Sequence, residues 1–287
     1  LRVLAPLYEE RLGRPADAVA AWERILALRP DDAAPLARLE AIHRAAGDDR
    51  ALCGVLRRLA DAAEAPERRM EILFEMASLL EDRIGDREAA IAAYRDVLSA
   101  DPSNTEAFGL LSRLLGETGA WPELAALLEQ GIARAAGAGD AAEARELRFR
   151  LGRVLQQHLG EPARAASLFG EVLADQARHP GALAALEELA RSDDAAARAR
   201  AAEGLAPIFA EERDFQRHVQ MLEELAATAD EPARRAAIHR DAAAIYEREL
   251  DAPEMAFLAA GRALEADPDD PDNLALCLRA AEASGDV

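Results

Sequence analysis

The side chains able to support metal or acid–base chemistry are the histidines and the neighbouring carboxylates. The five histidines are His43, His158, His179, His218 and His239. No two of them have the short helical spacing of a zinc-binding pair, and the chain has no Cys-x-x-Cys. Carboxylate pairs, which could act as general acid and base, occur at Glu9-Glu10, Glu81-Asp82 and Glu223-Glu224. In a chain of formal net charge −20 we interpret these pairs as solvated helix faces, and we predict no metal site and no catalytic residue.

A glycine-rich segment, Gly137-Ala138-Gly139-Asp140, is another place where chemistry could occur. A phosphate-binding loop would need a preceding strand and a following Gly-Lys-Ser/Thr, and the sequence around this segment offers neither. We therefore interpret it as a linker between helices. The chain also has no Gly-x-Ser-x-Gly nucleophile motif. These patterns predict a protein that is not an enzyme and that needs no cofactor.

The composition predicts a folded, acidic protein rich in helix. Hydrophobic residues make up 51% and charged residues 31%, which excludes a disordered chain. The abundant alanines favour tight helix pairs. The net charge of −20 argues against nucleic acid as a partner, because phosphate contacts require clustered cations. No apolar run is long enough to span a bilayer, so we expect no direct membrane insertion.

The arginines and cysteines indicate the source and the compartment. All 34 cations are Arg and none is Lys, a bias expected of a GC-rich bacterial genome. Cys53 and Cys277 are embedded in apolar helical patterns, so we expect two small core residues and not a disulfide framework. Together these features favour a cytoplasmic location in a bacterium.

A repeated helical unit must position these residues. The segment that begins at Gly13 recurs at Gly85, at Gly160 and more loosely at Asp251, at intervals of 72, 75 and 91 residues. Each copy carries three residues at intervals of four, which places them on one face of a helix. They are Ala18, Trp22 and Leu26; Ala90, Tyr94 and Leu98; Ala165, Phe169 and Leu173; and Ala256, Ala260 and Leu264. We expect these residues, Trp22 included, to form the core between paired helices.

The recurrence predicts about sixteen helices and no strands, in a single solenoid over residues 1–287. Its four superrepeats span about residues 1–65, 66–139, 140–230 and 231–287. Leu183, Leu186 and Leu189 keep helical spacing within the longest interval, so we expect an extra helix near residues 180–191. Leu1 aligns with Leu73, which lies inside a helix, so we expect the chain to be a fragment of a longer array.

The phased motifs resemble the tetratricopeptide repeat (TPR) family. Leu4-Ala5-x2-Tyr8 is similar to the motif of the family's first helix, helix A, and Ala18-x3-Trp22 and Ala90-x3-Tyr94 are similar to that of helix B. Pro30, Pro102 and Pro268 stand where the family's terminal proline belongs. The resemblance covers essentially the whole chain and implies an all-α, right-handed superhelix of TPR-like hairpins. Helix A departs from the family motif, because it is one residue longer between Tyr8 and Gly13.

The resemblance also implies a binding surface, since related proteins bind peptides on the concave face lined by their A helices. The candidate peptide-binding residues in this register are Arg44, Phe74, Arg113, Phe149, Arg153, Gln156 and Arg240. The family's carboxylate clamp uses Lys and Asn, whereas this chain has no Lys and has Asn only at Asn104 and Asn273, which we expect in turns. A clamp of that type is not expected, although Arg113 and Arg153 could bind a carboxylate differently.

The function that these observations favour is a non-enzymatic scaffold that binds a protein or peptide partner on its helix A surface. One alternative is the regulatory or sensing arm of a larger multidomain enzyme. Another is a self-assembly module, because the ends of a helical array can associate with each other.

Overall fold

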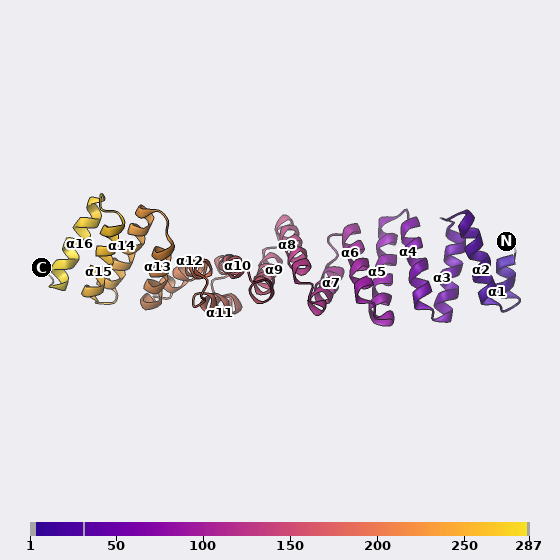
Figure 1. Ribbon diagram of the computed structural model, residues 1–287. Coiled ribbons are helices and arrows are strands. Elements are labelled where there is room, and N and C mark those ends of the chain that lie inside the picture. Colours follow the sequence, from indigo (N-terminus) through magenta and orange to yellow (C-terminus); the bar gives the residue numbers. More distant parts are fainter. Residues whose placement is uncertain (1–3, 31, 286–287) are drawn as a thin grey trace. The chain divides into compact units, whose positions relative to one another are not determined.

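The computed structural model describes residues 4–30 and 32–285 of the chain. Within these residues there are sixteen α-helices and no strand, as the sequence predicts (Figure 1). The prediction made for Leu1 concerns a residue outside this range. The helices are α1 (Leu4–Glu10), α2 (Pro15–Leu28), α3 (Ala33–Ala46), α4 (Asp49–Ala62), α5 (Pro66–Leu79), α6 (Arg87–Ala100), α7 (Thr105–Thr118), α8 (Trp121–Ala138), α9 (Ala141–Val154), α10 (Pro162–Asp175), α11 (Pro180–Leu189), α12 (Ala195–Glu211), α13 (Phe215–Thr228), α14 (Pro232–Arg248), α15 (Pro253–Ala266) and α16 (Pro271–Ser284).

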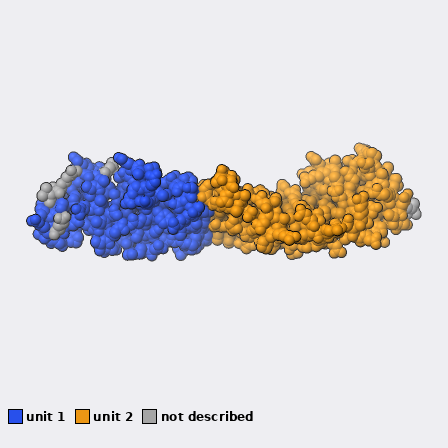
Figure 2. Space-filling model, turned by 180° about the vertical axis from the view of Figure 1, so that it is seen from behind, with its two compact units in different colours: residues 1–120 blue, residues 121–287 orange. Residues whose placement is uncertain are grey.

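The helices form two compact units, residues 1–120 and residues 121–287 (Figure 2). The first contains α1 to α7 and the second contains α8 to α16. Within each unit, helices that follow one another in sequence pack side by side as hairpins (Figure 1). This is the all-α, TPR-like hairpin fold that the repeat predicts. The division of the whole chain into four superrepeats of one solenoid stays a prediction. None of the described helices is both long and apolar enough to cross a bilayer.

The B helices α2, α6, α10 and α15 bury most of the residues that recur at intervals of four, whereas Leu98 and Leu264 are half-buried. Ala18, Ala90 and Ala165 are fully buried, and this small side chain lets the neighbouring helix approach closely. The aromatic residue one turn later fills the space between the helices, and Trp22, Tyr94 and Phe169 are each at most 6% exposed. The looser fourth copy has Ala260 at that position, also fully buried. The core therefore alternates small and large side chains along the B helices α2, α6 and α10, but not along α15.

All four A helices of the recurring segment end in the same wide turn. Its mark is a backbone hydrogen bond across six residues, from Asp86 N to Leu80 O at 2.9 Å and from Glu161 N to Leu155 O at 3.1 Å in the second and third copies. The equivalent bonds join residue 14 to residue 8 and residue 252 to residue 246. In the middle copies the turn is a π-helical segment, η1 (Leu80–Ile84) and η2 (Leu155–Leu159). The wide turn accommodates the extra residue that separates this repeat from the family motif.

Helix α11 occupies the region in which the sequence pattern places an additional helix, and α12 packs directly against both α11 and α10. Close approach of α10 and α12 depends on Gly204, which faces Gly170. A Cβ on Gly204 would lie 3.2 Å from the Cα of Gly170 and 2.9 Å from a methyl carbon of Leu186. The chain thus continues its stack from α10 to α12 while α11 lies beside it.

Candidate binding surface

Arg44, the candidate arginine on α3, forms two ion pairs inside the first unit. Its guanidinium lies 2.6 Å from a carboxylate oxygen of Glu75 on α5 and 2.8 Å from one of Glu40 on its own helix. These hydrogen bonds to Glu75 and Glu40 raise the pKa of Arg44 above its ordinary value. Arg44 therefore joins α3 to α5, and its charge is already neutralised by two carboxylates.

Arg113 on α7 is engaged in the same way. It donates to Glu81 in the turn after α5, and to Glu117 at 3.0 Å, and both bonds raise the pKa of Arg113. Glu81 also accepts a hydrogen bond from the Tyr94 hydroxyl at 3.2 Å. The candidate Phe74 packs edge-on against the Tyr94 ring, with centroids 5.8 Å apart. Phe74 and Arg113 thus belong to one packed network that links α5, α6 and α7.

The wide turn carries an acidic residue at the same position in three of its four copies, and each acid is paired. Glu81 pairs with Arg113, and Glu247 pairs with Arg279 at 3.7 Å, the arginine following the glutamate by 32 residues in both cases. In the first copy Arg38 lies 3.7 Å from Glu9. The repeat thus uses this carboxylate to hold the helix that follows helix B.

The third copy differs, because Gln156 stands where the other copies have glutamate. The Oε1 atom of Gln156 is buried and accepts no hydrogen bond from the described part of the chain. Arg153, three residues earlier on the same side of the helix, is exposed and forms no ion pair within residues 4–30 and 32–285. These two of the seven candidates therefore keep hydrogen-bonding capacity that the fold does not use.

Phe149 on α9 serves to pack α11. Its ring centroid lies 5.7 Å from that of Phe169 and 4.8 Å from that of His179. A Cβ on Gly181 would come within 2.5 Å of the Phe149 ring, so a larger residue there would displace that ring. His179 in turn caps α11, since its Nδ1 accepts a hydrogen bond from the backbone N–H of Ala182 at 3.1 Å. Phe149 is half-buried in this cluster.

Arg240 on α14 is held by the start of α16. It lies 2.5 Å from Asp270 and donates to the Asn273 Oδ1 at 2.9 Å. Asn273 is fully buried in the first turn of α16 and not in the preceding turn, which corrects the placement expected from the sequence. Its amide donates to the carbonyl of Asp267 at 2.8 Å. Hydrogen bonds from the Asp272 backbone and from Arg240 lower the pKa of Asp270.

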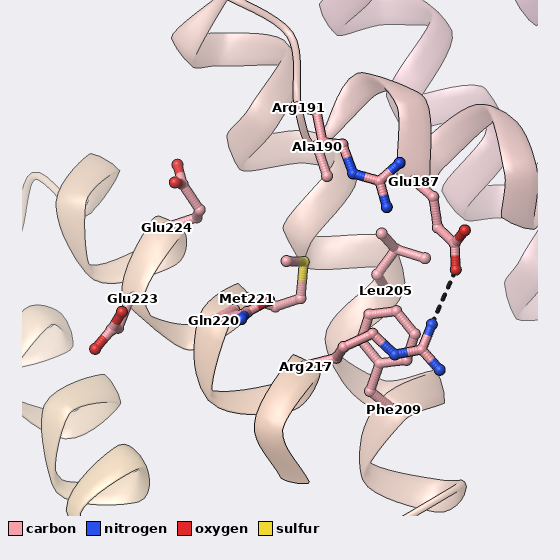
Figure 3. Close-up of a pocket in the computed structure, with 10 residues that line it drawn as sticks. All are labelled: Glu187, Ala190, Arg191, Leu205, Phe209, Arg217, Gln220, Met221, Glu223 and Glu224. Carbon is pink, nitrogen blue, oxygen red and sulfur yellow. Dashed lines mark hydrogen bonds and ion pairs between the residues drawn. The ribbon is translucent and has the colours of Figure 1, made fainter. Parts of the chain in front are cut away.

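The second unit also contains a pocket that sequence reasoning missed. It has a volume of about 290 Å³ and lies between α11, α12 and α13 (Figure 3). Its residues come from three helices that meet only once the chain has folded, so no local sequence signal marks it. The lining residues are Glu187, Ala190, Arg191, Leu205, Phe209, Arg217, Gln220, Met221, Glu223 and Glu224.

The other side chains that could bind a metal or act in catalysis lie apart from one another. The described residues include no group of three or more His, Cys, Asp or Glu side chains arranged to hold a metal ion. Cys53 is buried, which raises the pKa of its thiol, and Cys277 is half-buried. His158 in η2 stacks on Trp121 at the start of α8, with ring centroids 3.6 Å apart and planes 2° apart.

Comparison with known proteins finds similarity to solved structures. The C-terminal part of a TPR repeat-containing protein from Cytophaga hutchinsonii is 16% identical, with 96% of this chain and 98% of that chain covered and a TM-score of 0.33. A tetratricopeptide repeat protein from Parabacteroides merdae is 15% identical over 96% and 95% of the two chains, with a TM-score of 0.30. The TPR2AB domain of yeast Sti1, solved as an HSP90 complex, is 16% identical over 75% and 84%, with a TM-score of 0.34. No protein-family model and no curated protein matches the chain.

Proposed function

We propose that this chain of TPR-like helical hairpins is a non-enzymatic scaffold that binds a segment of another protein on its helix A surface. The observation that carries the proposal is the unused hydrogen-bonding capacity of Arg153 and Gln156 on neighbouring turns of one helix. Three of the other predicted residues, Arg44, Arg113 and Arg240, are arginines neutralised within the fold. The binding surface is therefore centred on the end of α9 and on η2.

The chemistry of the pair fits a polypeptide. A buried acceptor without a donor costs about 1–3 kcal/mol, and the Gln156 side chain is only half-buried, so rotation of its amide toward a donor of the partner recovers that free energy on binding. The Arg153 guanidinium offers several donors to a carbonyl or carboxylate. One peptide segment can supply both groups: a backbone N–H that donates to Gln156, and a carbonyl or acidic side chain that accepts from Arg153.

Affinity capture with the full-length protein tests this proposal. Arg153→Glu reverses the unpaired charge, and we expect it to remove the partners that wild type captures. Arg150→Glu is the matched control, because Arg150 lies on the same helix and is also unpaired among the described residues, but stands six residues, about 9 Å along the helix axis, from Gln156. Captured partners that are lost equally with Arg150→Glu, or retained with Arg153→Glu, would contradict the proposed surface.

Self-association is a second candidate function, supported by exposed leucines on the first and last described helices. Leu274 and Leu278 on α16 are 50% and 59% exposed, and Leu4 and Leu7 on α1 are 49% and 36% exposed. Contact of these two surfaces between copies would be head-to-tail. Light scattering at increasing protein concentration tests it, with Leu274→Glu as the disrupting variant; a constant monomeric mass for wild type would exclude it.

A further inference from the structure

The pocket between α11, α12 and α13 combines an apolar floor with a mostly neutralised rim. Leu205, Phe209 and Met221 form the floor and are 1%, 3% and 9% exposed. The Arg217 guanidinium lies over the Phe209 ring, 4.3 Å from its centroid, and pairs with Glu187 at 3.1 Å. The stacked arginine and its partner form one wall of the pocket (Figure 3).

The other acidic residues at the rim are also engaged. Glu224 pairs with Arg198 at 3.1 Å. Glu223 accepts from the Tyr246 hydroxyl at 3.3 Å and lies 3.5 Å from Arg262. In Figure 3 both of these carboxylates point away from the pocket. The rim therefore presents little free negative charge to a bound group.

Arg191, in the turn after α11, differs from the other charged residues of the rim in having no partner among the described residues. Its side chain reaches over the space between Leu205 and Met221 (Figure 3). It is exposed, and within the described part of the chain it forms no ion pair and no side-chain hydrogen bond. An unpaired guanidinium above an apolar floor is complementary to a ligand with an apolar group beside an anion.

We propose that this pocket binds a peptide segment in which one large apolar side chain neighbours an aspartate or glutamate side chain. The apolar side chain fills the space above Leu205, Phe209 and Met221, and the carboxylate receives hydrogen bonds from Arg191. The inference rests on the proposed function, because it takes a protein partner as given, but it uses a surface separate from Arg153 and Gln156.

The volume of the pocket and the position of Gln220 at its edge favour this ligand. A volume of about 290 Å³ lies at the low end for small-molecule sites, which suits a single anchoring side chain. Gln220 on α13 borders the pocket from a different helix than Arg191 and is exposed without a hydrogen-bond partner among the described residues. Its amide can both donate to and accept from a peptide backbone. A segment that contacts both Arg191 and Gln220 runs across the opening, so its carboxylate belongs to a side chain and not to a chain end.

Fluorescence anisotropy with the full chain tests the proposal. The ligand is a labelled octapeptide with blocked ends that carries one Leu-Glu pair in a Gly-Ser background. We expect saturable binding, weakened at least about tenfold when the peptide's Leu is replaced by Ala or its Glu by Gln. Arg191→Glu should weaken binding by a similar factor, and Ala190→Phe should abolish it by filling the pocket.

Arg178→Glu is the matched control for Arg191→Glu, because Arg178 is exposed, unpaired and in the same unit, and the change in charge is identical. Circular dichroism of each variant verifies folding. Absence of binding at millimolar peptide would overturn the inference, as would equal effects of Arg178→Glu and Arg191→Glu. Binding of a peptide whose only carboxylate is its C-terminus would overturn the assignment to a side chain. If binding is absent, or if Arg178→Glu and Arg191→Glu act equally, while capture still depends on Arg153, the pocket assignment fails and the proposed function stands.

Discussion

The Glu81 carboxylate in the turn after α5 receives a hydrogen bond from the Arg113 guanidinium of α7, and the pair recurs as Glu247 and Arg279. Between them in the chain, the third copy places Gln156 at the position of the glutamate, with an unpaired buried oxygen. A structural ion pair of the repeat is therefore missing at one site. We propose that the partner binds at that site.

Loss of the Glu81–Arg113 pair is expected to destabilise the first unit. Arg113→Ala leaves a carboxylate that is only 13% exposed without its main donor, so the free energy of unfolding should fall by about 1–2 kcal/mol. Arg68→Ala removes an exposed pair, with Glu71, and should change it by less than about 0.5 kcal/mol. Thermal denaturation followed by circular dichroism compares the two. Equal effects would show that the Glu81 contact has no special structural role.

The wide turns require a left-handed residue, and this makes two opposite predictions. Gly85 has φ of 74°, so Gly85→Ala should lower the free energy of unfolding by about 1 kcal/mol. Asp251 occupies the equivalent position with φ of 50°, so Asp251→Gly should leave stability unchanged or raise it. Melting temperatures that shift in the same direction for both variants would contradict the shared turn geometry.

The close packing of α10 against α12 predicts that replacing Gly204 by alanine destabilises the protein, whereas the same change at Gly54 does not. Gly204→Ala places a methyl group 3.2 Å from the Gly170 backbone, so the free energy of unfolding should fall by about 1–3 kcal/mol. Gly54 in α4 has no atom within 4 Å of an added Cβ, and Gly54→Ala should stabilise by about 0.5–1 kcal/mol through helix propensity. Urea denaturation of both variants measures the contrast, and a neutral Gly204→Ala would argue against this packing.

Two half-buried histidines predict how stability depends on pH. Burial lowers the pKa of His218 and of His239 below the ordinary value, so folding favours the neutral imidazole. Their contribution is present above the unfolded pKa of about 6.5 and is lost as the pH falls through the lower folded pKa. The melting temperature should therefore decrease below about pH 6.5, and less steeply in His239→Gln. Parallel curves for wild type and variant would exclude His239 as a cause.

Several elements of this fold could be predicted from the sequence because their causes are local. The spacing of Ala18 and Trp22 predicts one buried helix face, and the additional residue before Gly13 marks the wide turn. The pairing of candidate arginines could not be predicted, since Glu75 and Glu81 meet them only after hairpins pack. The pocket floor at Leu205 and Met221 likewise depends on how α11 lies beside α12 and α13. The repeat register therefore predicts which residues are candidates for binding a partner. The packing of the hairpins determines which of these residues remain free of ion pairs within the fold.

The most direct test of the central claim is the affinity of a captured partner for wild type, Arg153→Glu and Arg150→Glu, measured by isothermal titration calorimetry. We expect Arg153→Glu to weaken binding at least about tenfold and Arg150→Glu to change it less than about twofold. Equal affinity of wild type and Arg153→Glu would contradict the claim that the partner binds at Arg153 and Gln156.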